Sequence, residues 1–297
     1  MRTSTTRVWI ALALVYVVWG STYLGIRIVV ETMPPFLSAG ARFLTAGALL
    51  AGIVAWRRGP AALKATRAQA GSAVLVGLLL VLGGNGLVVL AETTVPSGLA
   101  ALLVAAVPMW LVVLRAGSGD RPSPRTLAGV LLGLGGLAVL TSPGFGGEIG
   151  LGGVLLVLTA SVLWALGSFS AARLTLPADP FAGSAYQMLA GGAAGILVGL
   201  CRGEQHGLDP ASYSTASWLA LGYLVLFGSL VGFTAYVWLL RAAPLSLVAT
   251  YAYVNPVVAV ALGWLILDEA LTWPILLGGA IVVAAVCVIV STERRTV

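Results

Sequence analysis

The chain carries one pattern of residues twice, at nearly constant spacing. One set recurs 145 positions later, so that Trp19, Pro35, Phe36, Leu44, Gly47 and Ala48 match Trp164, Pro180, Phe181, Leu189, Gly192 and Ala193. A second set recurs 148 positions later, so that Leu82, Gly84, Val89, Pro96, Leu99, Ala101 and Pro108 match Leu230, Gly232, Val237, Pro244, Leu247, Ala249 and Pro256. The small difference between the offsets indicates one short loop change. The sequence therefore predicts two units of one architecture, residues 1–145 and 146–297.

The composition places both units in a membrane. Charged residues make up 9% of the chain and apolar residues 59%, and the mean hydropathy is +1.03. A soluble domain of this length needs more charge on its surface. We therefore expect an integral membrane protein throughout. The net charge of +6 comes from basic residues in short loops. That distribution indicates membrane orientation, and no nucleic-acid partner is expected.

Ten apolar segments are long enough to cross about 30 Å of hydrocarbon. They lie near 8–30, 36–56, 72–91, 95–114, 126–141, 150–172, 181–201, 216–240, 245–267 and 271–290. Five segments fall in each unit, and an odd number of crossings turns the second unit upside down relative to the first. The predicted fold is an all-α integral membrane protein with ten transmembrane helices as two inverted five-helix repeats. Many secondary transporters use such repeats to build alternating access around a midplane cavity.

The basic residues predict the orientation of the chain. Thirteen of the sixteen Lys and Arg residues fall on one side, at both chain ends, in loops 57–70 and 115–125, and at Arg173 and Arg241. Only Arg202 lies on the other side, since Arg27 and Arg42 fall within spans. By the positive-inside rule both termini are cytoplasmic and the loop 202–213 is external. An even number of spans also requires that the two termini lie on the same side of the membrane.

Three motifs resemble those of a known family. They are Trp19-Gly20-Ser21-Thr22-Tyr23, the Pro35-Phe36 pair followed by Arg42, and the run from Ala91 to Leu103 followed by Pro108. Together they resemble the EamA family of the drug/metabolite transporter superfamily, from about Trp9 to Val290. The resemblance implies a multi-pass protein of the bacterial inner (cell) membrane that exports small metabolites, including amino acids. It does not fix the substrate, because related transporters carry different solutes.

The first span of each unit carries a polar or aromatic stripe at helical spacing. The stripes are Tyr16, Trp19 and Tyr23 in the first unit and Ser161, Trp164 and Ser168 in the second. Residues at i, i+3 and i+7 share one helix face. At about 1.5 Å per residue, both tryptophans fall near the middle of the bilayer. Two interpretations remain open: the stripes line a central cavity, or they pack against neighbouring helices.

Further polar and aromatic residues lie at membrane depth in the third, eighth and ninth spans. They are Asn85, its repeat counterpart Phe233, and Tyr236, Tyr251 and Asn255. An amide in hydrocarbon needs a partner within the bundle or contact with water. We expect these residues and the two stripes to form a substrate-binding cavity, although each asparagine also fits a role in joining helices.

Two charged residues, Arg42 and Glu92, lie within or beside the spans. Arg42 and Gln187 match at the 145 offset, and an intramembrane arginine indicates either a substrate contact or a structural role. Glu92 ends the third span at the outer interface. It is a candidate for proton coupling, or alternatively a weakly desolvated partner of Arg27 or Arg42. Four repeated prolines are expected to kink helices near a gate, namely Pro96, Pro108, Pro244 and Pro256.

The sequence favours a transporter over the other membrane-protein classes. It has no zinc pair, aspartate cluster or nucleophile elbow of an intramembrane enzyme, no filter of a channel and no phosphate-binding loop of an ATP-driven pump. We expect a secondary-active or facilitative exporter of amino acids or amphipathic drug-like solutes that works by alternating access. The alternative is a membrane sensor, facilitator or importer. We expect no enzyme activity, metal or cofactor. The expected partners are a small-molecule substrate and the lipid bilayer, and a monomer is compatible with the sequence.

Overall fold

The computed structural model describes residues 5–119, 123–140 and 150–293, and these residues form helices and connecting segments without a strand. The first unit contains α1 (Thr5–Val30), α2 (Pro35–Arg58), η1 (Pro60–Leu63), α3 (Arg67–Gly77), η2 (Leu78–Gly86), α4 (Leu87–Ala91), α5 (Ser97–Val104), α6 (Val107–Gly117) and α7 (Pro124–Leu140). The second contains α8 (Leu151–Ala171), α9 (Pro180–Cys201), η3 (Glu204–Gly207), α10 (Thr215–Tyr223), η4 (Leu224–Phe233), α11 (Thr234–Ala242), α12 (Leu245–Val248), α13 (Tyr251–Leu267) and α14 (Trp273–Glu293). The predicted boundary between the units, at residues 145 and 146, lies outside the described residues.

The helices follow the predicted spans. Among the described residues, seven continuous helical stretches are long and apolar enough to cross a membrane. Three shorter apolar helices cover the remaining predicted spans, namely Pro124–Leu140, Val254–Leu267 and Trp273–Ile289. The prediction of an all-α membrane fold with ten helical segments is confirmed.

The third and eighth spans share a feature that the sequence analysis did not predict. In each of them the middle of the helix is π-helical, over η2 and η4. A π-helix is a wider helix whose hydrogen bonds join residue i to residue i+5, and short π-helical turns are frequent at functional sites. The two segments contain the repeat counterparts Gly84 and Gly232. The widened turns therefore occur at matching places in the two units.

The four repeated prolines divide into two groups. Pro96 is the N-cap of α5, and Pro244 directly precedes α12. The expectation of kinks at these two positions is therefore wrong, because both residues stand where helices begin and a missing N–H costs little. Pro108 lies in the first turn of α6, after the break at Ala105 and Ala106, and Pro256 lies inside α13. Of the four, only Pro108 and Pro256 therefore lie within the observed helices.

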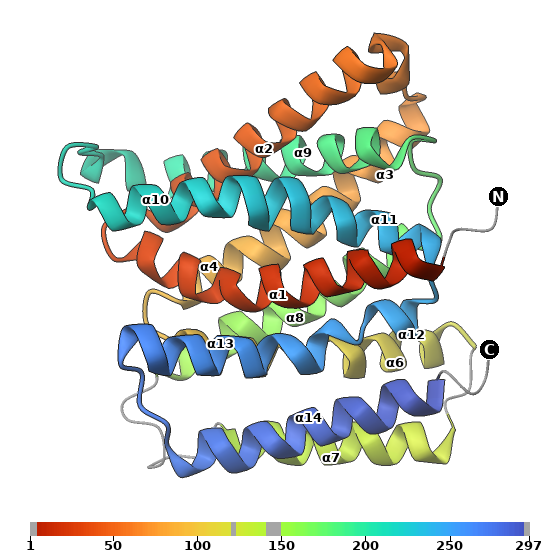
Figure 1. Ribbon diagram of the computed structural model, residues 1–297, viewed down its shortest axis with the longest axis vertical. Coiled ribbons are helices and arrows are strands. Elements are labelled where there is room, and N and C mark those ends of the chain that lie inside the picture. The colour runs from red at the N-terminus through yellow and green to blue at the C-terminus, as the bar shows by residue number, and fades with distance from the viewer. Residues whose placement is uncertain (1–4, 120–122, 141–149, 294–297) are drawn as a thin grey trace.

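Contacts between α2 and α9 distinguish the two ends of the bundle. At one end, here called the acidic end, Glu204 beyond α9 accepts hydrogen bonds from the backbone N–H groups of Phe36 and Leu37 at the start of α2. At the other end, here called the basic end, Arg58 at the end of α2 pairs with Asp179 at the start of α9. Consequently α2 and α9 run in opposite directions. Figure 1 shows that α1 begins and α14 ends at the basic end.

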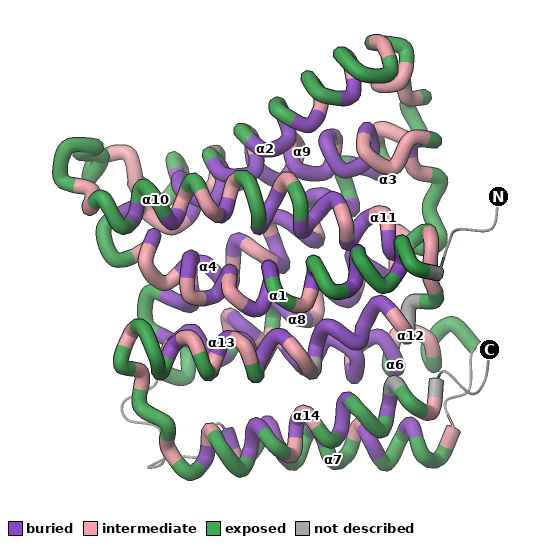
Figure 2. Tube along the Cα trace, in the orientation of Figure 1, coloured by how far each residue is buried: buried purple, intermediate pink, exposed green. Residues whose placement is uncertain are grey.

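Two pairs of repeat-related helices flank the centre of the fold. Helix α2 packs along α9, and α7 packs along α14. Between these pairs, α1 packs against α13 and η4, and α8 packs against η2, α5 and α6 (Figure 1). The buried residues gather along this central layer, whereas exposed residues follow the outer faces of α7 and α14 (Figure 2). This arrangement brings α1 and α8, which carry the two predicted stripes, to the middle of the molecule.

Candidate functional site

An aromatic cluster occupies the centre of the bundle. The rings of Trp19 and Trp164 meet edge to face, with centroids 5.3 Å apart and planes at 83°. The Tyr236 ring lies 4.8 Å from Trp19 and 5.4 Å from Trp164, and Tyr251 lies 5.5 Å from Trp19. All four side chains are buried. Edge-to-face contacts of this kind are favourable beyond the apolar area they bury.

Hydrogen bonds fix the polar edges of this aromatic cluster. The Nε1–H of Trp19 donates to the Gly228 carbonyl over 3.1 Å. The Nε1–H of Trp164 donates to the Tyr236 hydroxyl over 3.2 Å, and that hydroxyl lies 2.7 Å from the Ser168 hydroxyl. Because buried N–H groups need acceptors, these bonds hold the two indoles in defined orientations.

Two repeat-related glycines make room for the indoles. A Cβ atom on Gly84 would lie 2.6 Å from Cε3 of Trp164, and one on Gly232 would lie 2.6 Å from Nε1 of Trp19. Each indole thus rests on a π-helical glycine of the other unit. Close approach of a ring to the backbone requires a residue without a side chain. The repeated tryptophans and glycines therefore form two reciprocal contacts between the units.

A cavity opens beside the aromatic cluster. It encloses about 580 Å³ of empty space, including the part that opens to solvent. Its lining residues come from α1, α2, α5, α8, α13 and the two spans that contain a π-helix. They are Trp19, Thr22, Tyr23, Ile26, Arg42, Phe43, Gly84, Asn85, Val88, Val104, Ala160, Ser161, Trp164, Gly228, Phe233, Tyr251 and Asn255. From the tryptophans the α1 lining extends through Tyr23 to Ile26, toward the acidic end. The cavity therefore lies between the centre of the bundle and that end.

The structure brings most of the predicted cavity residues together. Eight of them line the cavity, namely Trp19, Tyr23, Asn85, Ser161, Trp164, Phe233, Tyr251 and Asn255. Three others lie outside the lining. Tyr16 forms a hydrogen bond with the Thr250 hydroxyl, while the hydroxyl groups of Ser168 and Tyr236 bond to each other. Tyr16 and Ser168 lie nearer the basic end than Trp19 and Trp164 on the same helices. These three residues help to close the bundle between the cavity and the basic end.

Arg42 is buried in the cavity wall, with a relative exposure of 2%. Its Nε–H donates to the Ser229 hydroxyl over 2.7 Å, and Nη1 donates to the Asn85 amide oxygen over 3.4 Å. No carboxylate among the described residues lies within ion-pair distance of this guanidinium. A buried cation held only by neutral groups retains donors for an anionic ligand. The sequence analysis did not predict a role for Ser229. Its repeat counterpart is Val81, and this replacement of an apolar residue by a polar one at membrane depth is a signal that could have identified it.

The two asparagines join different parts of the cavity wall. Asn85 lies in the π-helical turn and accepts from Arg42. In the amide orientation that satisfies its hydrogen bonds, the Asn255 nitrogen donates to the backbone carbonyls of Tyr16 over 3.1 Å and Tyr251 over 3.3 Å. Asn255 therefore connects α13 to α1 next to Pro256. Asn255 thus both joins two helices and lines the cavity, as the two interpretations of the sequence expected.

Glu92 differs from its predicted environment. It was expected at the interface with weak desolvation, but its side chain is fully buried, and neither carboxyl oxygen has a hydrogen-bond partner among the described residues. Arg27 donates to the backbone carbonyl of Glu92 and forms no ion pair with its carboxylate. Burial raises the pKa of this carboxyl well above 4.5, and Glu269 raises it further, whereas Arg27 and Arg42 lower it. Glu92 does not line the cavity.

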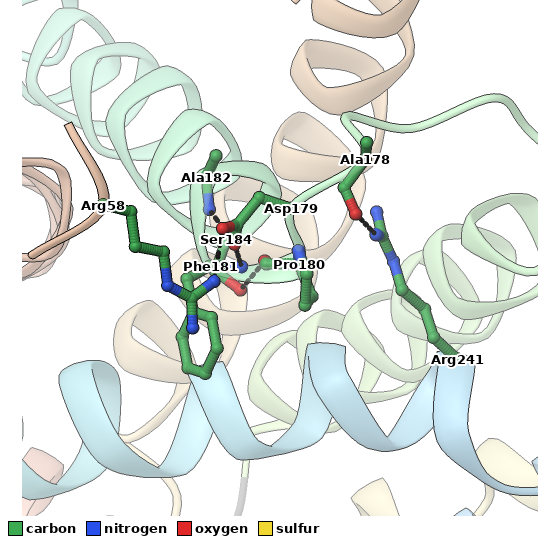
Figure 3. Close-up of polar contacts among 8 residues, drawn as sticks. All are labelled: Arg58, Ala178, Asp179, Pro180, Phe181, Ala182, Ser184 and Arg241. Atoms are coloured by element: carbon green, nitrogen blue, oxygen red, sulfur yellow. Dashed lines mark hydrogen bonds and ion pairs between the residues drawn. The ribbon is translucent and has the colours of Figure 1, made fainter. Parts of the chain in front are cut away.

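Polar contacts close the bundle at its basic end. Arg58 pairs with the Asp179 carboxylate, and its guanidinium also lies 4.7 Å from the centre of the Phe181 ring (Figure 3). Asp179 accepts hydrogen bonds from the N–H groups at the start of α9, and Arg241 of α11 donates to the Ala178 carbonyl over 3.3 Å. These contacts join the ends of α2 and α11 to the start of α9.

Two acidic residues at the acidic end, Glu204 and Glu269, cap the N-termini of helices. The sequence analysis did not predict this role. Glu204 accepts from the first N–H groups of α2, and Glu269 accepts from the N–H groups of Ser97 over 2.7 Å and Gly98 over 3.0 Å at the start of α5. Carboxylates satisfy the unpaired donors and the positive dipole of a helix N-terminus. Each acid follows one helix and caps another that is distant in sequence, so no local motif announces it.

Within the described residues, no group of three or more His, Cys, Asp or Glu side chains is placed to hold a metal ion. Cys201 and Cys287 are free thiols exposed on the surface of the bundle.

The chain matches the EamA-like transporter family twice, over residues 7–142 and 151–291. The chain belongs to this family. The predicted resemblance is confirmed, and the protein is a membrane transporter of the EamA type. Among curated relatives, an inner membrane transporter of Escherichia coli, YedA, is 42% identical over 256 residues, which cover 85% of this chain and 80% of the relative. A probable amino-acid metabolite efflux pump of the same species is 28% identical, covering 91% of this chain and 90% of the relative.

A more distant relative matches nearly the whole chain in sequence, and a protein of known structure shares its fold. An uncharacterized transporter of Bacillus subtilis, YvbV, is 27% identical and covers 98% of this chain and 93% of its own length. A protein known from a crystal structure superimposes with a TM-score of 0.69 at 22% identity, covering 99% of this chain and all of the other. The helical architecture of this EamA-type chain is therefore that of a known experimental fold.

Proposed function

We propose that this protein exports an amphipathic small metabolite, such as an apolar or aromatic amino acid, by alternating access. The observation that carries the proposal is the composition of the central cavity. It combines an aromatic wall formed by Trp19, Trp164 and Tyr251 with the buried cation of Arg42. An aromatic wall suits an apolar side chain, and a guanidinium suits a carboxylate. The efflux pump of Escherichia coli named above supports the choice of metabolite and the direction of transport.

The proposed orientation places the acidic end outside the cell. Basic residues at the opposite end include Arg57, Arg58, Lys64 and Arg67, which the positive-inside rule assigns to the cytoplasm. Both termini are then cytoplasmic, in the inner membrane of a bacterium. In this orientation the cavity lies in the outer half of the bundle. The Arg58–Asp179 pair and the aromatic cluster around Tyr236 close the bundle toward the cytoplasm.

The cavity lining favours transport over catalysis. Among the described residues, the lining contains no histidine, cysteine or carboxylate that a general acid, a nucleophile or a metal site requires. Transport driven by exchange or by an outward gradient needs no titratable group in the cavity. Coupling to protons would depend on Glu92, which lies outside the lining. We therefore propose secondary-active or facilitative export.

A panel of metabolites tests this proposal in proteoliposomes. Efflux of radiolabelled amino acids and related monocarboxylates is measured for the wild type, for Trp164→Ala and for Trp264→Ala. The last variant is a matched control, because Trp264 is 52% exposed on α13 and lies outside the cavity. We expect efflux of at least one amphipathic carboxylate, a loss of about tenfold or more with Trp164→Ala, and no loss with Trp264→Ala. Binding of a panel member without transport would instead indicate a sensor.

A further inference from the structure

A buried side-chain amide in the closed half of the bundle has no hydrogen-bond partner among the described residues. Gln187 of α9 is fully buried, and neither its amide nitrogen nor its amide oxygen has a hydrogen-bond partner among the described residues. Buried amides are almost always hydrogen-bonded, because leaving both groups unpaired costs more than a hydrogen bond contributes. An orphaned buried amide in a native structure therefore requires an explanation.

Gln187 is the repeat counterpart of Arg42. The two residues lie 145 positions apart, and each follows the first proline of its helix, Pro35 or Pro180, by the same number of residues. At about 1.5 Å per residue, each lies about 10 Å inside its own end of the bundle. Helix α2 begins at the acidic end and α9 at the basic end. The two side chains therefore occupy equivalent depths in opposite halves.

The divergence of the two units explains why only Arg42 finds partners in this conformation. Arg42 bonds to Asn85 and Ser229, whose repeat counterparts are the apolar residues Phe233 and Val81. On the Gln187 side, Gly191 of the next turn packs against the Val81 side chain, and Gly77 packs against the Gln187 backbone. The Val81 side chain is apolar and offers the amide no hydrogen bond, and neither amide group of Gln187 reaches another partner among the described residues.

We propose that Gln187 is a substrate contact of the opposite, cytoplasm-open conformation, where it takes the place that Arg42 holds in the cavity described above. Inverted repeats exchange their conformations between the two states of a transport cycle. In that exchange the half containing Gln187 opens and the amide meets water and the polar end of the substrate. The orphaned amide is the mark of a group that is satisfied in the other state. This inference rests on the proposed alternating access.

Cysteine accessibility tests the proposal directly. Gln187→Cys and Arg42→Cys are placed separately in a parent protein whose exposed Cys201 and Cys287 are replaced by serine. A membrane-impermeant maleimide is applied to right-side-out and to inside-out vesicles. The control is Ala185→Cys, because Ala185 is 1% exposed on the same helix and its counterpart Gly40 does not line the central cavity.

We expect Arg42→Cys to label from the outer side and Gln187→Cys to label only from the cytoplasmic side. A transported metabolite, at a concentration high enough to saturate each weakened variant, should slow the labelling of both, and Ala185→Cys should remain unlabelled. Labelling of Arg42→Cys alone, in a protein that still transports, would overturn the role of Gln187 and leave the proposed export intact. Labelling of both cysteines at rates that no metabolite of the panel slows would instead overturn the proposed function.

Gln187→Leu provides a second, independent measurement. Leucine fills a similar volume without polar atoms, so it should stabilise the conformation described here and disfavour the cytoplasm-open one. We expect a higher midpoint of thermal unfolding in detergent, together with a loss of efflux of about tenfold or more. Gln187→Asn keeps the amide and should retain more efflux than Gln187→Leu. Full efflux by a stably folded Gln187→Leu protein would contradict the proposal.

Discussion

Arg42 and Gln187 occupy matching positions in the two units, yet only Arg42 lines the cavity and forms hydrogen bonds. The duplicated helices are therefore equivalent in sequence position and different in chemical environment. One half of the bundle holds a cavity with a buried cation, and the other half is closed around an amide that has no partner in the described part of the chain. A transporter needs such a difference between its halves at any moment of its cycle.

The first prediction concerns the reciprocal contacts between tryptophans and glycines. Gly232→Ala should displace the Trp19 indole, because the added Cβ would lie 2.6 Å from its Nε1 atom. We expect a loss of efflux of about tenfold or more, since the indole forms the cavity wall. Gly222→Ala is the matched control in the same span, where a Cβ atom meets nothing within 4 Å. Equal efflux by the two variants would argue against the contact.

The second prediction concerns the charge of Arg42. Arg42→Gln removes the cation while keeping a hydrogen-bonding side chain. Charge-assisted hydrogen bonds contribute about 1.5–3 kcal/mol, which corresponds to about a tenfold to hundredfold loss of affinity for carboxylate solutes. Their esters or amides should bind equally well to both proteins. The measurement is competition for efflux by carboxylates and by their neutral analogues, and an equal loss for the two classes would assign Arg42 a structural role.

The third prediction follows from the raised pKa of Glu92. A buried acid whose pKa is raised stabilises the folded protein in its protonated form, and this stability is lost as the pH rises through the folded pKa. The thermal midpoint of the wild type should therefore fall as the pH rises above the ordinary carboxyl pKa of about 4.5. Glu92→Gln should lack that decline, because a neutral amide does not titrate. The charges that face Glu92 are those of Glu269, Arg27 and Arg42.

The same variant separates a structural role of Glu92 from proton coupling. With a structural role alone, Glu92→Gln keeps efflux driven by a pH gradient. With proton coupling, counterflow exchange survives and only efflux driven by the pH gradient disappears. Parallel pH–stability curves for the wild type and Glu92→Gln would show that this carboxyl does not determine the pH response.

The fourth prediction concerns orientation. Cysteines at Ala62 and Gly207 lie in loops at the basic and acidic ends, respectively. In intact cells an impermeant reagent should label Gly207→Cys and spare Ala62→Cys, because basic loops remain in the cytoplasm during insertion. Labelling of both positions from outside would contradict the proposed orientation.

The sequence predicted the parts of this site that depend on the repeat. Trp19 and Trp164 were paired because identical residues recur at a fixed offset, and equal depth in related helices brings them together. Asn85 was marked by its polarity in an apolar span. These features are properties of one residue and its helix, so a single sequence carries them.

The features that escaped prediction depend on contacts between distant residues. Glu204 and Glu269 cap helices far from them in sequence, which no local motif encodes. The π-helical turns arise from a shift of backbone hydrogen bonds that hydrophobic periodicity does not register. The burial of Glu92 was missed because position along a span gives depth in the membrane and not the packing around it.

The most direct test of the central claim is protection of a cysteine in the cavity by a transported solute. Asn255→Cys, in the parent protein without Cys201 and Cys287, is exposed to an impermeant maleimide from the outer side with and without a metabolite that the protein exports. The account predicts labelling that the exported metabolite slows about tenfold at saturating concentration, whereas a related solute that is not exported has no effect. Equal labelling rates with and without the exported metabolite would contradict the assignment of this cavity as the substrate site.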